Sequence, residues 1–112
     1  MFEAQILNNN SAAFSPWMPR GGDNITFTFE IIDKLLSQDF QVQLFEKNSE
    51  ETGDGTAVGS EPLGSQSIGL HAATKTGMKE LVRYKYSFKG AVPGDWVLFR
   101  ILPPVWFDDV KA

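Results

Sequence analysis

The chain has 112 residues, of which 42% are hydrophobic and 21% are charged, and its formal net charge is −4. This length fits one domain, and this composition excludes wholesale disorder. There are no cysteines, so disulfides, cysteine metal sites and thiol catalysis are excluded, and we predict a protein made in the reducing cytoplasm. The negative charge argues against nucleic acid as the main partner. No segment approaches the roughly 18 apolar residues of a membrane span, so we expect no membrane partner.

Apolar and polar residues alternate in several segments, which is typical of strands with one buried face. In chain order, the predicted strands are 2–7, 24–30, 40–46, 67–72, 82–89 and 96–102. The clearest is VRYKYSFK at 82–89, in which every second residue is apolar. The last, WVLFRIL at 96–102, is apolar on both faces apart from Arg100. That pattern predicts a central strand, or an edge strand covered on both sides by a partner.

Turn residues separate these segments. Pro93-Gly94 fits the central positions of a type II turn, because Pro fixes the first φ and Gly accepts a positive second φ. Residues 89–95 are therefore expected to close a hairpin between the last two strands. Residues 48–66 are rich in glycine and poor in apolar side chains, which predicts a long exposed loop with a short strand near Ala57. The segment 31–38 has apolar residues at helical spacing, and we expect a strand end that passes through a bulge or a single helical turn.

About six or seven short strands with Gly and Pro turns predict an all-β fold, a small antiparallel β-sandwich of jelly-roll or immunoglobulin-like topology. A small barrel is the alternative. We expect residues 1–112 to form a single domain. The predicted core consists of Phe27, Phe29, Val42, Leu44, Tyr84, Tyr86, Phe88, Leu98 and Phe99.

The sequence offers little for catalysis. Its one histidine, His71, lies in a predicted strand, whereas a catalytic triad needs a base held between a carboxylate and a nucleophile. There is no nucleophile elbow, phosphate loop, dinucleotide fingerprint or zinc-protease motif. Gly53-Asp54-Gly55 superficially suggests calcium, but the regularly spaced acidic ligands of a calcium loop are absent, which favours a solvated acidic loop. We therefore predict no enzyme, no cofactor and no metal site.

Two segments combine prolines with large apolar side chains, FSPWMPR at 14–20 and LPPVWF at 102–107. Proline bars both from central strand pairing and favours an extended backbone. Trp, Met, Phe and Arg are enriched in interface cores. The candidate partner-binding residues are Phe14, Trp17, Met18, Arg20, Val105, Trp106 and Phe107. Two alternatives remain: each segment packs on its own sheet, or exposed Trp17 and Trp106 rings stack on glycans in a carbohydrate-binding module.

Acidic residues concentrate in the first half of the chain and basic residues in the second, which favours attraction within one sandwich or docking between copies. In its aromatic strands and Pro/Trp segments, the chain resembles the small β-sandwich decoration or cement proteins of tailed-phage virions. The stretches that carry this resemblance are SPWMPRGGDNITFTFE at 15–30 and GDWVLFRILPPVWF at 94–107. The resemblance is one of overall character, without a specific motif. It implies a non-enzymatic structural protein of the virion, a homo-oligomer that binds itself or a capsid protein.

Overall fold

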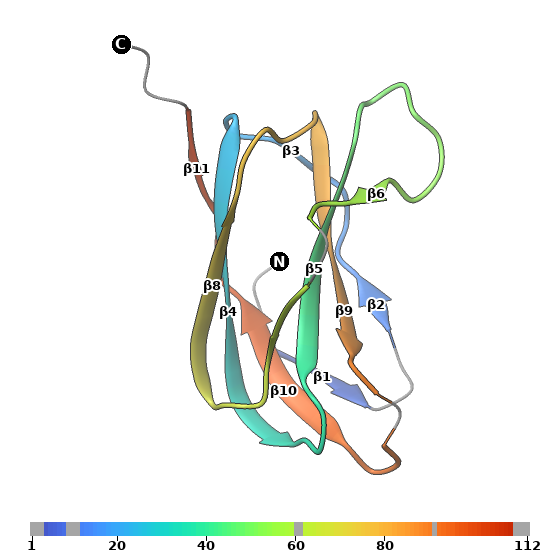
Figure 1. Ribbon diagram of the computed structural model, residues 1–112, viewed down its shortest axis with the longest axis vertical. Coiled ribbons are helices and arrows are strands. Elements are labelled where there is room, and N and C mark those ends of the chain that lie inside the picture. Colours follow the sequence, from blue (N-terminus) through green and yellow to red (C-terminus); the bar gives the residue numbers. More distant parts are fainter. Residues whose placement is uncertain (1–3, 9–11, 60–61, 91, 109–112) are drawn as a thin grey trace.

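A computed structural model describes residues 4–8, 12–59, 62–90 and 92–108 of the chain. In this part of the chain there are eleven strands and no helix (Figure 1). The strands are β1 (Gln5–Asn8), β2 (Ala13–Phe14), β3 (Met18–Pro19), β4 (Asn24–Leu35), β5 (Phe40–Lys47), β6 (Thr56–Ala57), β7 (Leu63–Ser65), β8 (Gly69–Lys75), β9 (Leu81–Phe88), β10 (Trp96–Ile101) and β11 (Val105–Phe107). Positions 2 and 3 of the first predicted strand lie outside the described residues.

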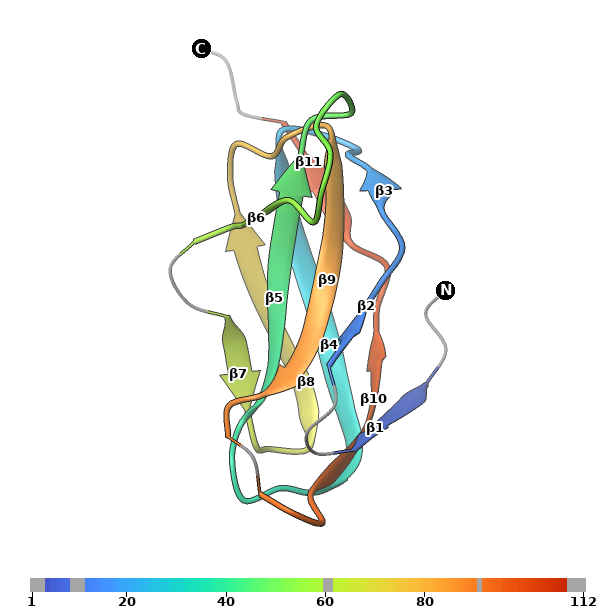
Figure 2. The ribbon, with the colours of Figure 1, turned by 90° about the vertical axis from the view of Figure 1, so that its right-hand side faces the viewer.

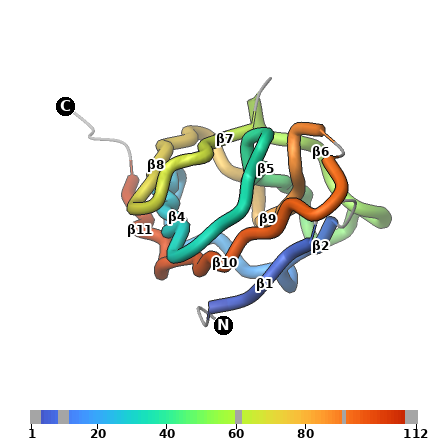
Figure 3. The backbone as a smooth tube through the Cα atoms, turned by 90° about the horizontal axis from the view of Figure 1, so that it is seen from below, coloured from blue at the N-terminus to red at the C-terminus, as the bar shows by residue number. Residues whose placement is uncertain are grey.

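The strands form two antiparallel sheets packed face to face, without a closed barrel (Figures 2 and 3). In sheet A, β10 lies between β1 and β4, β11 continues the line of β10 along β4, and β8 pairs with the other side of β4. In sheet B, β2 and β3 follow one another along β9, β9 pairs with β5, and β7 and β6 follow one another along β5. The predicted all-β sandwich is confirmed.

The connectivity identifies the kind of sandwich. Because three pairs of strands lie in line, the eleven strands occupy eight positions, four in each sheet. Numbered along the chain, the positions run first, eighth, third, sixth in sheet A and second, seventh, fourth, fifth in sheet B. This is the order of a jelly roll, which consists of eight strands in two Greek keys. Of the two predicted topologies, the jelly roll is the one that this chain adopts.

A layer of aromatic side chains fills the space between the sheets. The Phe40 ring lies 4.5 Å from that of Phe99 and 5.5 Å from that of Phe29, measured between ring centroids. Phe27 and Tyr84, from opposite sheets, are 5.6 Å apart. Alternation produces this layer, because every second side chain of a strand points to the same face. The predicted core residues that are buried are Phe27, Phe29, Val42, Leu44, Tyr84, Tyr86 and Phe99.

Two predicted core residues lie elsewhere. Phe88 is half-buried and packs against the rim of the core. Leu98 alternates with buried Val97 and Phe99, pairs with Asp33 and is half-buried on the outer side of sheet A, so its assignment to the core is wrong. The error arises because both faces of β10 are apolar, and alternation cannot then distinguish inside from outside. The position of β10 between β1 and β4 confirms the prediction of a central strand.

The segment with helical apolar spacing is the end of β4, and it contains a β-bulge. The register with β10 shifts between Leu98, opposite Asp33, and Phe99, opposite Ile31. Ile32 is therefore the extra residue of the bulge, where two residues of one strand face one residue of its neighbour. The bulge leaves Ile31 buried and Ile32 exposed, which confirms the prediction of a strand that passes through a bulge.

The turn at Pro93-Gly94 is confirmed, but the hairpin predicted around it is wrong. The backbone N–H of Asp95 donates to the Val92 carbonyl at 3.2 Å, and Gly94 has a positive φ of 88°. However, β9 belongs to sheet B and β10 to sheet A, so this turn carries the chain across the sandwich. The buried Asp95 carboxylate accepts a hydrogen bond from the Ser37 backbone N–H at 2.7 Å, which fixes the turn to the end of β4.

Replacing Phe27 by alanine tests the core. Phe27 is 1% exposed, so we expect Phe27→Ala to lower the free energy of unfolding by about 3–5 kcal/mol, as for other buried Phe residues. The control is Thr28→Ala on the outer side of the same strand, for which we expect a change within about 0.5 kcal/mol. Urea unfolding measures both variants. A loss below about 1 kcal/mol for Phe27→Ala would contradict the assignment of this strand face.

Candidate interaction surfaces

The N-terminal Pro/Trp segment forms the edge of sheet B. Its two short strands, β2 and β3, pair with β9 one after the other. Pro16 lies between them and has no backbone N–H to donate, which interrupts the ladder. Phe14 points outward and is 44% exposed. Met18 points inward and packs against the core, so it is part of the fold rather than of a free surface.

Trp17 is half-buried among basic side chains of its own sheet. The Arg83 guanidinium carbon lies 4.0 Å from the centre of the Phe14 ring and 4.6 Å from that of Trp17. The Lys47 ammonium lies 4.6 Å from the centre of the Trp17 ring. Cations are attracted to aromatic ring faces, so these four residues form a cluster within the chain. We call Phe14, Trp17, Lys47 and Arg83 the aromatic–basic cluster.

The Gly53-Asp54-Gly55 segment packs on this cluster. The Asp54 carboxylate accepts a hydrogen bond from Arg83 at 3.0 Å. Gly55 has a φ of +79°, and a Cβ there would lie 2.7 Å from both the Trp17 ring and the Glu46 carbonyl oxygen. The interpretation of this segment as a solvated loop therefore missed a structural contact, because the arginine that it meets lies far away in the sequence. The short strand expected near Ala57 is present as β6.

Arg20 is held by the main chain of a neighbouring turn. Its guanidinium donates a hydrogen bond to the Met78 carbonyl at 2.7 Å and lies 3.9 Å from the Asp23 carboxylate. Met78 is itself buried. Arg20 thus fixes the end of the segment 14–20 to the turn before β9.

The C-terminal Pro/Trp segment continues sheet A as β11. Trp106 is half-buried and packs against the core, and a Cβ on Gly21 would lie 2.7 Å from its ring. Val105 and Phe107 alternate with it, point outward and are 63% and 42% exposed. The alternation of a three-residue strand therefore separates one inward ring from two outward apolar side chains.

The two Pro/Trp segments lie on the same side of the sandwich but do not form one site (Figure 2). They approach each other where the Asp23 backbone N–H donates to the Asp108 carboxylate at 3.1 Å. Phe14 points outward from sheet B, whereas Val105 and Phe107 point outward from sheet A. Because Trp17 and Trp106 are each half-buried against their own chain, neither offers a fully exposed ring for stacking on a sugar.

Exposed apolar side chains gather on the outer face of sheet A. At its centre, the Arg100 Nε donates to the Glu30 carboxylate at 2.6 Å. The sequence analysis identified only two exposed residues of this face, those from β11, because the other exposed residues come from β1, β4 and β8. The sequence signal that could have revealed the face was the strand with two apolar sides, β10. This strand lies between β1 and β4 and contributes half-buried Trp96 and Leu98. The exposed members of this face are Ile6, Ile32, Leu35, Leu70, Val105 and Phe107.

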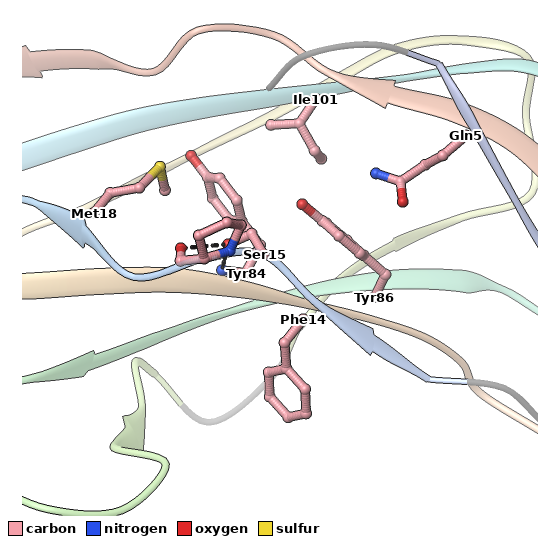
Figure 4. A pocket seen from close by; sticks show the side chains of 8 residues that line it. Gln5, Phe14, Ser15, Met18, Tyr84, Tyr86 and Ile101 are labelled. Carbon is pink, nitrogen blue, oxygen red and sulfur yellow. Dashed lines mark hydrogen bonds between the residues drawn. The ribbon is translucent and has the colours of Figure 1, made fainter.

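A cavity of about 130 Å³ lies between the two sheets, at the edge formed by β1 and β2 (Figure 4). Tyr84 and Tyr86 line it from β9, and Ile101 lines it from sheet A. Burial is the main cause that raises the pKa of Tyr86 to about 12, and burial raises the pKa of Tyr84 as well. Both phenols are therefore neutral at physiological pH. Sequence reasoning treated both rings as core and did not predict this cavity.

The remaining features to place are metal-binding groups, the single histidine and membrane-spanning helices. Within them, no group of three or more His, Cys, Asp or Glu side chains is placed to hold a metal ion. His71 Nε2 lies 2.8 Å from the Ser67 carbonyl oxygen, and its ring is 5.2 Å from that of Phe29. No helix in the described part of the chain has the length and apolarity needed to span a bilayer.

Comparison with known proteins finds no matching family model, no matching curated protein and no matching solved structure.

Alkaline titration tests the burial of the two tyrosines, the only ones in the chain. Since the pKa of Tyr86 is raised from 10.0 to about 12, the folded protein keeps a proton that the unfolded chain loses in this range. The free energy of unfolding should therefore fall as the pH rises from 10.0 towards about 12, and Tyr86→Phe should reduce this dependence. Tyrosinate absorbance follows the ionisation. A midpoint at the ordinary value in the folded protein would contradict the burial.

Two glycine variants test the packing of the loop on Trp17. Gly53 and Gly55 both have positive φ, +93° and +79°, but a Cβ on Gly53 would meet nothing within 4 Å. We expect Gly55→Ala to be less stable than Gly53→Ala by roughly 1–3 kcal/mol, the usual cost of forcing an atom into a packed site. Urea unfolding followed by Trp fluorescence measures the difference. Equal losses would show that the contact with Trp17 contributes nothing.

Proposed function

We propose that this chain is a non-enzymatic structural protein that associates with a second copy through the outer face of sheet A, and that the oligomer decorates the capsid of a tailed phage. The observation that carries the proposal is the exposed apolar face on β1, β4, β8 and β11. Monomeric soluble proteins rarely expose apolar patches larger than a few hundred Å². The C-terminal Pro/Trp segment supplies two exposed members, Val105 and Phe107.

The composition of this face favours a second copy as its partner. Arg100 and Glu30 pair with each other at 2.6 Å, and the exposed carboxylate of Asp33, opposite Leu98, adds one further charge. A largely apolar surface of this kind can pack on its own image about a two-fold axis. Such isologous dimers are the commonest soluble oligomers.

The size of the face also suits self-association. The strands of sheet A contain 4 residues in β1, 6 in β10, 3 in β11, 12 in β4 and 7 in β8. At a rise of about 3.3 Å per residue and a strand spacing of about 4.8 Å, they cover roughly 500 Å². Stable interfaces bury about 800 Å² on each partner. Sheets stack face to face in many β-proteins, at a separation of about 10 Å. Two copies packed through sheet A would therefore bury roughly 1,000 Å² in total, near the lower limit for a specific interface.

Two features support the virion as the place where this oligomer acts. One is the resemblance in overall character to decoration proteins, and the other is the jelly roll, an architecture that occurs in viral capsid and lectin domains. A fold by itself does not specify a function, so the exposed face remains the main support. With sheet A used between copies, the outer face of sheet B, including Phe14 at 44% exposure, is left to contact the capsid shell.

Val105→Asp tests self-association. Val105 is 63% exposed, so an aspartate there should leave the fold of the single chain intact, whereas an unpaired charge buried between copies is costly. We expect light scattering after size exclusion to show an oligomer for the wild type and a monomer for Val105→Asp. The matched control is Ile68→Asp, which is 62% exposed but lies in the turn before β8, and it should remain oligomeric. A monomeric wild type, or equal dissociation of the two variants, would contradict the proposal.

A separate experiment tests the decoration of a capsid. The protein is mixed with empty capsids assembled from the major capsid protein encoded in the same genome, and bound protein is measured by co-sedimentation. Saturable binding supports decoration. The lack of such a capsid gene, or of co-sedimentation, would refute decoration and leave the result on self-association standing.

A further inference from the structure

The outer face of sheet B combines basic and aromatic side chains. Strands β2, β9 and β5 lie side by side there (Figure 2). On β9 and β5, buried residues alternate with half-buried ones, and the half-buried side chains point away from the core. Two of these, Phe45 and Lys85, extend the aromatic–basic cluster along the two strands. We call the aromatic–basic cluster together with Phe45 and Lys85 the basic patch of sheet B.

The centre of this patch is apolar. The Phe14 and Phe45 rings meet edge to face, with 6.1 Å between their centroids. Arg83 lies opposite Phe45, and its guanidinium carbon is 4.0 Å from the centre of the Phe14 ring. The Arg83 side chain is only 12% exposed and is paired with Asp54. The charge of Arg83 is thus already balanced, and the two phenylalanine rings are what the centre offers to a partner.

A lysine lies on either side of this centre. Lys85 is opposite Gln43, and Lys47 is opposite Leu81. Leu81 and Lys85 are four residues apart on β9, and a strand rises about 3.3 Å per residue, so the two lysines are separated by about 13 Å along the strands. In the part of the chain that the structure describes, neither ammonium has a carboxylate partner.

The contacts of these two ammonium groups are with neutral groups. Lys47 Nζ donates to the Gly53 carbonyl at 3.3 Å and lies 4.6 Å from the centre of the Trp17 ring. Lys85 Nζ lies 5.7 Å from the centre of the Phe14 ring. Neutral contacts hold the side chains in place but leave their charges uncompensated. Two positive charges, one on each side of an apolar centre, therefore remain on this face.

An acidic segment in an extended conformation complements this arrangement. Every second side chain of an extended chain points to the same side, so acids four residues apart span the same distance of about 13 Å, and the residue midway between them falls on the two rings. Opposite charges across an interface favour the correct partner and its orientation. We propose that the basic patch of sheet B binds an extended acidic segment of a partner protein, with carboxylates on Lys47 and Lys85 and an apolar side chain between them on Phe14 and Phe45.

Nucleic acid suits this patch less well. Bases need free ring faces on which to stack, whereas Lys47 and Arg83 already lie over the Trp17 ring. The loop that follows β5 adds Glu50 and Glu51, both exposed, and these would repel a continuous row of phosphates. A peptide with two spaced acids meets the lysines without such a row of charges.

This inference rests on the proposed function and deepens it, because it gives the chemistry of the capsid surface that sheet B would contact. The two outer faces of the sandwich would then differ in partner. The largely apolar face of sheet A joins copies of the chain, and the basic patch of sheet B joins a different protein.

NMR titration of the isotope-labelled protein with the capped peptide Thr-Asp-Thr-Phe-Thr-Glu-Thr tests the patch, because chemical shifts detect weak binding and locate it. We expect shift changes at residues 45–47 and 83–85 and at the Trp17 indole N–H, and they should shrink at high salt. Lys47→Gln and Lys85→Gln should each lower the affinity about two- to fivefold, the usual effect of one exposed charge pair. The matched control is Lys34→Gln, which removes a half-buried lysine from sheet A, and it should bind like the wild type.

The same titration can overturn the proposal. The absence of shift changes overturns it, as do changes confined to residues outside β2, β5 and β9. Equal binding of a peptide with lysines in place of both acids, or equal losses in Lys34→Gln and Lys85→Gln, would show that the lysines do not select an acidic partner. Binding of a single-stranded oligothymidylate but not of the acidic peptide would assign the patch to nucleic acid instead.

Co-sedimentation with capsids separates the failure of this inference from that of the proposed function. If Lys85→Gln binds capsids as tightly as the wild type, the inference is overturned and decoration stands. If capsids are not bound but the acidic peptide is, decoration is refuted, and the patch binds an acidic segment of another protein.

Discussion

The aromatic layer between the two sheets is the constraint on which the rest of the structure depends. Phe40 contacts Phe29 and Phe99 in this layer, so strands from both sheets must present their rings at the same depth. A slip of one residue in any strand would turn its apolar set to the outside, so the layer fixes the register of pairing. The bulge at Ile32 is one consequence: it leaves Ile31 in the layer and shifts the following residues of β4 relative to β10.

The same layer has open edges, and the Pro/Trp segments close them. Met18 covers the edge of sheet B and Trp106 that of sheet A, so one large apolar side chain of each segment stabilises the fold. Side chains that are neighbours on a strand point to opposite faces. Because the Trp106 side chain points inward, those of Val105 and Phe107 point outward. At the other end of this edge, the chain leaves a cavity beside Tyr84. The exposed face proposed for a second copy is thus a consequence of closing the sandwich.

Local patterns were sufficient for the strands and the class of fold. Alternation in 24–30, 40–46 and 82–89 predicted both the strands and their inner faces, because the side-chain period of a strand is a property of the backbone itself. Proline and glycine at 93–94 predicted the turn for the same reason. The interpretation of β10 as a central strand also held, because β10 pairs with β1 on one side and with β4 on the other.

Everything that depends on which strands are neighbours was decided by the tertiary structure. The Pro93-Gly94 turn specifies a reversal of the chain, but not that the chain changes sheets there. Leu98 and Phe99 are equally apolar, and only the packing of sheet A on sheet B turns Phe99 inward. The exposed apolar face consists of residues from four strands, and the cavity is lined by residues from both sheets. Neither the face nor the cavity can therefore be predicted from a single segment of the sequence. The sequence alone determined the strands, their periodicity and the turns, which are local properties; the surfaces required non-local pairing, which is set by the packing of the whole chain.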